Sequence, residues 1–203
     1  MKVVVFVDVQ NDFIDGALSV DKNKDVTAKI RKYAYICKCE HVPMIATRDT
    51  HEKSDSLPES ADGTIPEKHI GYLATLEGQK LPIEHCIEGT DGWKIDEGLA
   101  EYIPVDNIVN KQTFGSIGDL PRRLGDIDYS LKNAYGEGVT EIELCGFCTD
   151  ICLVSNALIL RAAFPNLRIT TLRNLCAGTT QENHEAALKV LASCQIDVRD
   201  AIV

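Results

Sequence analysis

The sequence predicts an α/β fold, a three-layer sandwich with a central, mostly parallel six-stranded sheet and helices on both faces. Segments with strand character alternate with segments of helical spacing along the whole chain, which is typical of parallel strands joined by crossover helices. Val3–Val7 is an uninterrupted and mostly β-branched apolar run, as expected of a central strand buried on both faces. The 203 residues suit one domain, 1–203, because no Pro-, Gly- or Ser-rich linker divides them.

Three strands are predicted within the first 110 residues. After Val3–Val7, apolar side chains recur with helical spacing over Lys24–Cys39, and the apolar Pro43–Thr47 is the next strand. Residues 53–70 have the character of an insertion or a lid near the candidate site. Asn107–Asn110 is the third strand.

The second half continues the alternation. Tyr129–Tyr135 is predicted as a short helix, and the apolar-rich Glu141–Cys145 is predicted as a strand. Leu153–Ala163 is long and apolar enough to form a buried helix. The remaining elements are a strand at Arg168–Leu172, a helix at Gln181–Ala192 and a strand at Ile196–Val198.

The composition disfavours some classes of binding partner and favours one cellular compartment. A formal net charge of −10 argues against nucleic acid or an anionic membrane as a partner, because both require a basic face. No apolar run is long enough to span a bilayer, and Asp8 follows the first apolar run too early for a secretory signal. Eight cysteines without an export signal favour reduced thiols and a cytoplasmic location. We also expect a homo-oligomer.

Four polar or reactive groups follow predicted strands. They are Asp8, the pair Asp49 and His51, Lys111, and Cys152. In open parallel sheets, ligands bind at the carboxyl ends of the strands. We therefore expect these side chains to gather at one edge of the sheet.

Cys152 lies between the strand at Glu141–Cys145 and the helix at Leu153–Ala163. A sulfur at a helix N-terminus is near backbone N–H groups that favour the thiolate, which is the nucleophilic form. Taken alone, a cysteine in such a place is more often a buried core residue. A thiolate metal site that uses Cys145, Cys148 and Cys152 is disfavoured, because no second cysteine pair or histidine pair follows at ligand spacing.

Four segments resemble the motifs of one family, and they occur in the family's order. Asp8-Val9-Gln10-Asn11-Asp12-Phe13, Lys111 after the third strand, and Gly146-Phe147-Cys148-Thr149-Asp150-Ile151-Cys152 are similar to motifs of the isochorismatase-like cysteine hydrolases. Arg48-Asp49-Thr50-His51 and the later His85-Cys86-Ile87-Glu88-Gly89-Thr90-Asp91-Gly92 resemble the metal-site segments of the nicotinamidase branch. The resemblance extends from residue 3 to about residue 200.

The resemblance implies a catalytic triad. Cys152 would attack an amide carbonyl and form a thioester, with release of ammonia. Asp8 would be the general base towards the thiol and then the general acid towards the leaving amine. Lys111 would lower the pKa of the thiol and orient Asp8. Taken singly, Asp8 reads as a strand-end turn residue and Lys111 as a solvated surface lysine.

The resemblance also implies the surroundings of the nucleophile. The backbone N–H groups of Cys148 and Cys152 would form the oxyanion hole, which also agrees with their place at a helix start. The family has a cis peptide bond between non-proline residues in this loop. Here it would join Phe147 to Cys148.

A metal site is the second implication of the resemblance. Asp49, His51 and His85 form a mixed oxygen and nitrogen ligand set suited to one divalent transition ion, with zinc as first choice and iron or manganese as alternatives. Glu77 and Glu59 are both candidates for a fourth ligand, and Glu77 is closer to His85 in sequence. The alternative is two surface histidines beside an acidic loop residue.

The substrate contacts depart from the family pattern. Nicotinamidases place an aromatic residue just before the segment of the second metal histidine, whereas this chain has Leu81-Pro82-Ile83-Glu84-His85. We expect Phe13 and Phe114 to contact the substrate in its place, with Tyr72 and Trp93 as alternatives. The residues after Lys111 also differ from the family's usual sequence.

The expected function is hydrolysis of a small carboxamide through a cysteine thioester, with conversion of nicotinamide to nicotinate and ammonia as the leading reaction. One alternative is a related amidase acting on carbamoyl or ureido compounds. Another is a catalytically silent member of the family that binds a partner or a ligand. The joint presence of Asp8, Lys111 and Cys152 favours an enzyme over the silent alternative.

Overall fold

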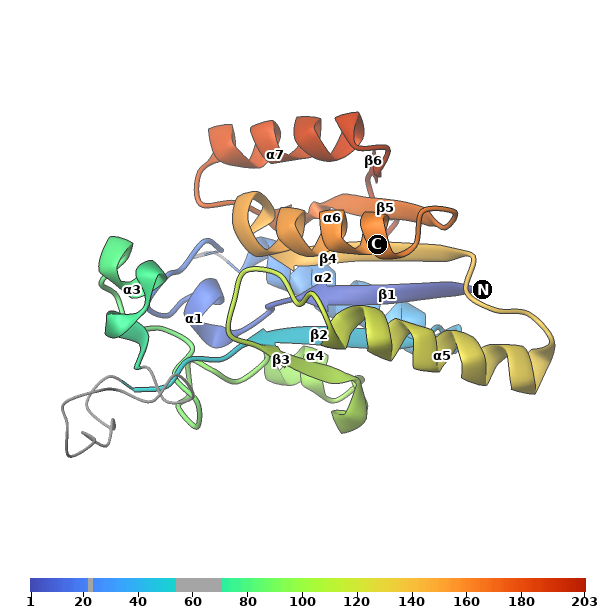
Figure 1. Cartoon of the computed structure of the whole chain (residues 1–203), viewed down its shortest axis with the longest axis horizontal. Helices are drawn as coiled ribbons and strands as arrows, with labels where there is room; N and C mark the ends of the chain where they lie inside the picture. Colours follow the sequence, from blue (N-terminus) through green and yellow to red (C-terminus); the bar gives the residue numbers. More distant parts are fainter. Residues whose placement is uncertain (22–23, 54–70) are drawn as a thin grey trace.

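The computed structural model describes residues 1–21, 24–53 and 71–203. Its centre is a six-stranded sheet in the order β3-β2-β1-β4-β5-β6, and every strand pairs with its neighbours in parallel (Figure 1). The predicted fold class is confirmed. The strands are β1 (Lys2–Val7), β2 (Met44–Asp49), β3 (Ile108–Lys111), β4 (Glu141–Phe147), β5 (Arg168–Ala177) and β6 (Asp197–Arg199).

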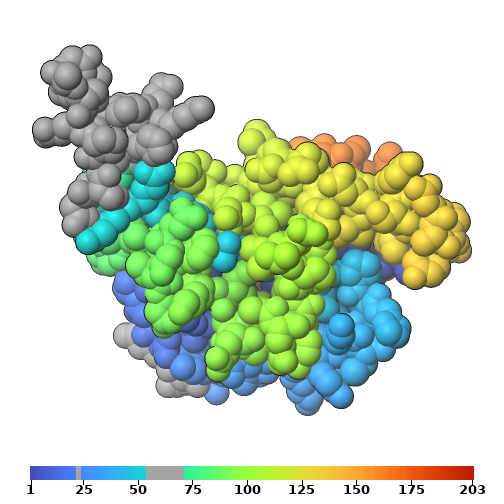
Figure 2. Space-filling view, turned by 90° about the horizontal axis from the view of Figure 1, so that it is seen from below, coloured from blue at the N-terminus to red at the C-terminus, as the bar shows by residue number. Residues whose placement is uncertain are grey.

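Helices cover both faces of this sheet. In Figure 1, α5 (Asp119–Tyr135) and α6 (Val154–Ala163) lie in front of it, and α2 (Asp25–Cys39) lies behind it. Figure 2 looks onto the edge at β3, where the residues of α5 and those of α2 lie on opposite sides of the molecule. The other helices are α1 (Asn11–Ile14), α3 (Leu76–Lys80), α4 (Glu97–Ala100), α7 (Gln181–Ser193), the 3₁₀ turns Tyr72–Ala74 and Val105–Asn107, and the π-helical turn Thr149–Leu153.

The central strands are buried on both faces, as their sequence predicts. Val3–Val7 of β1 is completely buried, and the interior of β4 is buried from Ile142 onward. Val3–Val7 shows no polar alternation, and the apolar side chains of both strands hold the helical layers on the sheet. Glu143 of β4 is the exception, a buried carboxylate paired with Lys2 and Arg199. Within the described residues, no helix has the length and apolar character needed to cross a bilayer.

Two predicted elements are longer in the structure by five residues or more. The helix expected at Tyr129–Tyr135 begins ten residues earlier, at Asp119, because Pro121 falls in the first turn, where a missing N–H costs nothing. The strand at Arg168–Leu172 continues to Ala177 beyond an irregularity in its register with β4. The insertion or lid predicted at 53–70 lies outside the described residues, apart from Lys53.

The strand order reverses direction between β1 and β4. From β1 the chain runs to β2 and β3 on one side, and from β4 it runs to β5 and β6 on the other. A crevice forms at the carboxyl ends of the strands where the order reverses. Asp8 directly follows β1, and Cys148 directly follows β4. The topology therefore brings both residues to this crevice.

Gly146 makes the close approach of β4 to β1 possible. Its φ is 122°, and a Cβ at this position would lie 2.1 Å from the carbonyl oxygen of Val7. We expect Gly146→Ala to lower the free energy of unfolding by about 2 kcal/mol or more, since both the backbone conformation and the clash oppose it. Urea denaturation measures the change.

Gly125 provides a matched control for this substitution. It lies in the middle of α5, and a Cβ there would meet no atom within 4 Å. Gly125→Ala should raise the free energy of unfolding by up to about 1 kcal/mol, because alanine favours the helix. Equal effects of the two substitutions would contradict the role given to Gly146.

Candidate active site

A buried lysine lies at the centre of the crevice. Lys111, the last residue of β3, has its Nζ 2.6 Å from Asp8 Oδ2, 3.0 Å from Asp49 Oδ1 and 3.5 Å from Cys152 Sγ. Burial lowers the pKa of Lys111, but its electrostatic interactions with Asp8, Cys152 and Asp49 raise the pKa by a larger amount, so it lies well above the ordinary value. The ammonium is therefore charged and paired. The structure brings all three predicted triad residues together.

Asp8 is held by its backbone and by a neighbouring strand. It is completely buried in a left-handed conformation with a φ of 48°, and its Oδ1 accepts a hydrogen bond of 2.7 Å from Thr47 Oγ1 of β2. Among the described residues, Oδ2 accepts no hydrogen bond of ordinary geometry and has only the ion pair with Lys111. Burial raises the pKa of Asp8 more than Lys111 lowers it. A raised pKa suits a group that both accepts and returns a proton.

The surroundings of Cys152 act in opposite directions on its thiol, and the balance disfavours the thiolate. Its burial raises the pKa of the thiol, Lys111 lowers it, and Asp8 and Asp49 raise it again, so that the net pKa lies well above its ordinary value. The predicted effect of Lys111 is present but smaller than that of burial. A thiol in this environment needs a base in order to become a nucleophile, and Asp8 contacts the same ammonium as Cys152.

The chain around Cys152 forms a short turn that we call the Cys152 turn, residues 148–152. The peptide bond between Phe147 and Cys148 is cis, as the resemblance implied. Cys152 lies in the π-helical turn Thr149–Leu153 that leads into α6, and Asn156 of α6 donates a hydrogen bond of 2.8 Å to the Cys152 carbonyl. Single π-helical turns of this kind occur frequently at functional sites.

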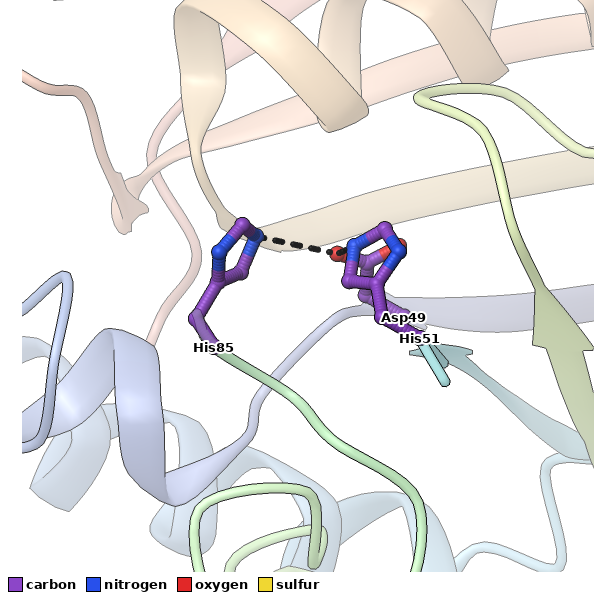
Figure 3. Close-up of side chains that lie close together, drawn as sticks. All are labelled: Asp49, His51 and His85. Carbon is purple, nitrogen blue, oxygen red and sulfur yellow. Dashed lines mark hydrogen bonds and ion pairs between the residues drawn. The ribbon is translucent and has the colours of Figure 1, made fainter. Parts of the chain in front are cut away.

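The predicted metal ligands also lie together. Asp49 and His51 come from the end of β2 and the residues after it, and His85 comes from the loop after α3, with its ring directed at the Asp49 carboxylate (Figure 3). Their candidate ligand atoms lie within 4.8 Å of one another, and all three residues are buried. Asp49 Oδ2 is 2.9 Å from His51 Nε2 and 3.5 Å from His85 Nε2.

The hydrogen bonds of this cluster suit a metal ion. His85 Nδ1 is 2.9 Å from the carbonyl oxygen of Ile83, which can only accept, so Nδ1 carries the proton and Nε2 of the neutral ring has a free lone pair. Burial raises the pKa of Asp49, but Lys111 and the two histidines lower the pKa by a larger amount, so the carboxylate is ionised. Two imidazoles and one carboxylate match a zinc-like ligand set. The residues present therefore fit the predicted ion.

The fourth ligand is less defined by the geometry. Glu77 Oε1 is 3.8 Å from His85 Nε2, and Glu77 lies outside the three-residue cluster. Burial and the charge of Asp49 raise the pKa of Glu77 more than His51, His85 and Lys111 lower it, so the net pKa is raised. Glu59, the other candidate, lies outside the described residues.

Two supporting side chains were not predicted. Gln10 donates from Nε2 to the Asp49 carbonyl at 2.9 Å and accepts from the Asp49 N–H at 2.7 Å, so it fixes the backbone of a residue shared by both sites. Asp12 accepts a hydrogen bond of 2.7 Å from the Cys86 N–H and so positions the loop that carries His85. Both belong to the segment after β1 that the resemblance had already singled out.

A cavity of about 780 Å³ opens onto both clusters. Cys152, Cys148, Asp49 and His85 line it, and so do Phe13 and Phe114, the two aromatic residues predicted to contact the substrate. The alternatives do not line it. Tyr72 is completely buried against the rings of His51 and His85, at centroid distances of 4.7 and 4.8 Å. Trp93 stacks on the Arg48 guanidinium, whose Cζ is 3.6 Å from the ring centroid.

Known proteins with similar sequences or folds include several amidases. The chain is 27% identical over 215 residues to the nicotinamidase of Schizosaccharomyces pombe, with 96% of this chain and 91% of that protein covered. The fold resembles a Pyrococcus horikoshii pyrazinamidase in complex with zinc, with a TM-score of 0.66, 22% identity and coverage of 98% and 99%. It also resembles the N-carbamoylsarcosine amidase of Thermoplasma acidophilum, with a TM-score of 0.65, 18% identity and coverage of 98% and 95%.

A family model for the isochorismatase domain matches residues 2–202, which is nearly the whole chain. Such a match shows the family, and the six-stranded parallel sheet with Asp8, Lys111 and Cys152 at its carboxyl edge agrees with it. The chain belongs to the isochorismatase family.

Proposed function

We propose that this protein is an amidohydrolase that cleaves a small carboxamide through a thioester on Cys152, with nicotinamide to nicotinate and ammonia as the leading reaction. The observation that carries the proposal is the grouping of Cys152, Lys111 and Asp8 beside the Asp49, His51 and His85 cluster. Cys152, Asp49 and His85 line one cavity. The likeness to the S. pombe nicotinamidase supports the same substrate class.

Asp8 is the proposed base. It takes the proton from the Cys152 thiol while the sulfur attacks the carbonyl carbon, and the N–H groups of Cys148 and Cys152 stabilise the oxyanion. Asp8 then gives the proton to the leaving nitrogen, so the C–N bond breaks, ammonia departs and a thioester forms. Water activated by Asp8 hydrolyses this thioester, which releases the carboxylic acid and restores the thiol. Lys111 holds the Asp8 carboxyl group in place and favours the thiolate form of Cys152.

Asp49, His51 and His85 would hold the metal ion, with Glu77 as the proposed fourth ligand. When bound, the ion supplies a Lewis-acid contact for a ring nitrogen of the substrate. Phe13 and Phe114 supply apolar contact from the cavity walls. We retain the cytoplasmic location and the homo-oligomer as predictions.

A panel of amides tests the reaction. We expect release of ammonia from nicotinamide and pyrazinamide to exceed that from ureidoacrylate and N-carbamoylsarcosine. The reverse order would favour the carbamoyl or ureido alternative, which the fold likeness to N-carbamoylsarcosine amidase and the missing aromatic residue before His85 support. Absence of ammonia from every amide would contradict the amidohydrolase.

Cys152→Ala should lower ammonia release by about a thousandfold or more, because no thioester can form. The fold should remain, which circular dichroism and thermal unfolding would show. Cys148→Ala is the matched control, since Cys148 lines the same cavity and contributes only its backbone N–H. If Cys148→Ala were inactive and Cys152→Ala active, the nucleophile would be Cys148 and the assignment of Cys152 would be wrong.

The metal should be measurable without any assay of activity. We expect elemental analysis of protein purified without chelator to give one divalent transition ion per chain, and His85→Ala to lose it. His41→Ala is the control, because His41 is exposed. Bound metal should fall as the pH drops below about 6, since the imidazoles must be neutral to bind.

Removal of the ion tests its role. If it orients the ring, chelation should raise KM for nicotinamide about tenfold, equivalent to about 1.4 kcal/mol of substrate binding. Alkylation of Cys152 by iodoacetamide should change far less. Metal-free protein with full nicotinamidase activity would contradict the proposal.

A further inference from the structure

The beginning of α7 packs directly against the Cys152 turn. Thr149 Oγ1 is 2.9 Å from His184 Nδ1, and both residues are buried. The Asp150 carboxylate accepts a hydrogen bond of 2.8 Å from the Thr179 N–H and another from the Thr179 hydroxyl. A Cβ at Gly178 would lie 2.7 Å from Asp150 Oδ1 and 3.0 Å from His184 Cβ. Only glycine permits so close an approach.

The contact between Thr149 and His184 is directional rather than a matter of filling space. Thr149 is completely buried between Cys148 and Cys152, and His184 is the only side chain among the described residues that hydrogen-bonds its hydroxyl. An apolar pair would fill the same volume without fixing an orientation. A hydrogen bond fixes the side chain of Thr149 and, through it, the backbone on which Cys148 and Cys152 lie.

His184 is separated from the reacting groups. It lines a second cavity of about 600 Å³ and not the cavity that contains Cys152, although Thr179 lines both. Burial lowers the pKa of His184; Glu185 and Asp150 raise it, and Arg173 lowers it, with a net decrease. The lowered pKa favours the neutral imidazole at neutral pH, and the ring is not part of the lining of the cavity that contains Cys152.

We propose that His184 is a positioning residue that holds the Cys152 turn through Thr149. It keeps Cys152 Sγ within reach of Lys111 Nζ and keeps the Cys148 N–H directed at the substrate carbonyl. The inference rests on the proposed function only in taking Cys152 as the nucleophile.

Paired substitutions test this role. Thr149→Val and His184→Ala remove the hydrogen bond, whereas Thr149→Ser retains the hydroxyl and His184→Asn retains a polar group at the place of Nδ1. We expect kcat for nicotinamide to fall about tenfold or more in the first pair, with little change in KM, because the nucleophile is misplaced while the binding cavity is intact. The conservative pair should recover most of the rate. The double variant Thr149→Val with His184→Ala should be no slower than the slower single variant.

The rate of iodoacetamide reaction at Cys152, followed by site-resolved mass spectrometry, gives a readout independent of turnover. It should fall in Thr149→Val and recover in Thr149→Ser, and Cys39, which is exposed, is the internal control. Thermal unfolding of each variant shows whether a lower alkylation rate at Cys152 is accompanied by a loss of stability. If Thr149→Val loses stability but keeps the wild-type kcat and alkylation rate, the positioning role is overturned.

The two proposals fail in different ways. Wild-type protein that releases no ammonia from any amide would contradict the proposed function. The alkylation rates of the four variants would still decide whether His184 positions the turn. Wild-type activity in both His184→Ala and Thr149→Val would contradict the positioning role alone.

Discussion

The ion pairs of Lys111 are the constraint on which the site depends. A buried ammonium without partners is strongly unfavourable, and Lys111 has two buried carboxylates at 2.6 and 3.0 Å. Asp8, Asp49 and Lys111 stand at the ends of β1, β2 and β3, so the charges meet only when these strands pair in the observed order. The observed strand order is therefore also the order that pairs the buried charge of Lys111 with Asp8 and Asp49.

Asp49 connects the two halves of the site. Its Oδ1 faces Lys111, whereas its Oδ2 faces the two histidines. One carboxylate thus serves both the charged centre beside Cys152 and the metal cluster. Gln10 holds the backbone of Asp49 on both its N–H and its carbonyl sides, which explains why a residue that contacts neither reacting group is completely buried there.

Much of this arrangement could be predicted from the sequence, because it depends on where strands end. The apolar runs before Asp8, Asp49 and Lys111 locate strand ends, and parallel pairing brings strand ends to one edge. The ring partners of Tyr72 and the hydrogen bond of His184 could not be predicted, because they join segments whose separation in sequence carries no periodic signal. The helix α5 was predicted too short, since Pro121 and Gly125 resemble breakers until the first turn is located. The raised pKa of Cys152 depends on burial in three dimensions, and a helix-start pattern indicates the opposite sign.

The most direct test of the account is a comparison of ammonia release by Asp8→Asn, Lys111→Met and the variant with both substitutions. If Lys111 acts by holding Asp8 and Cys152 in one charged unit, each single substitution removes most of the rate, and the double variant is no slower than the slower single variant. Losses that multiply in the double variant would show that the two residues act independently. That result would contradict the central role of the buried ammonium.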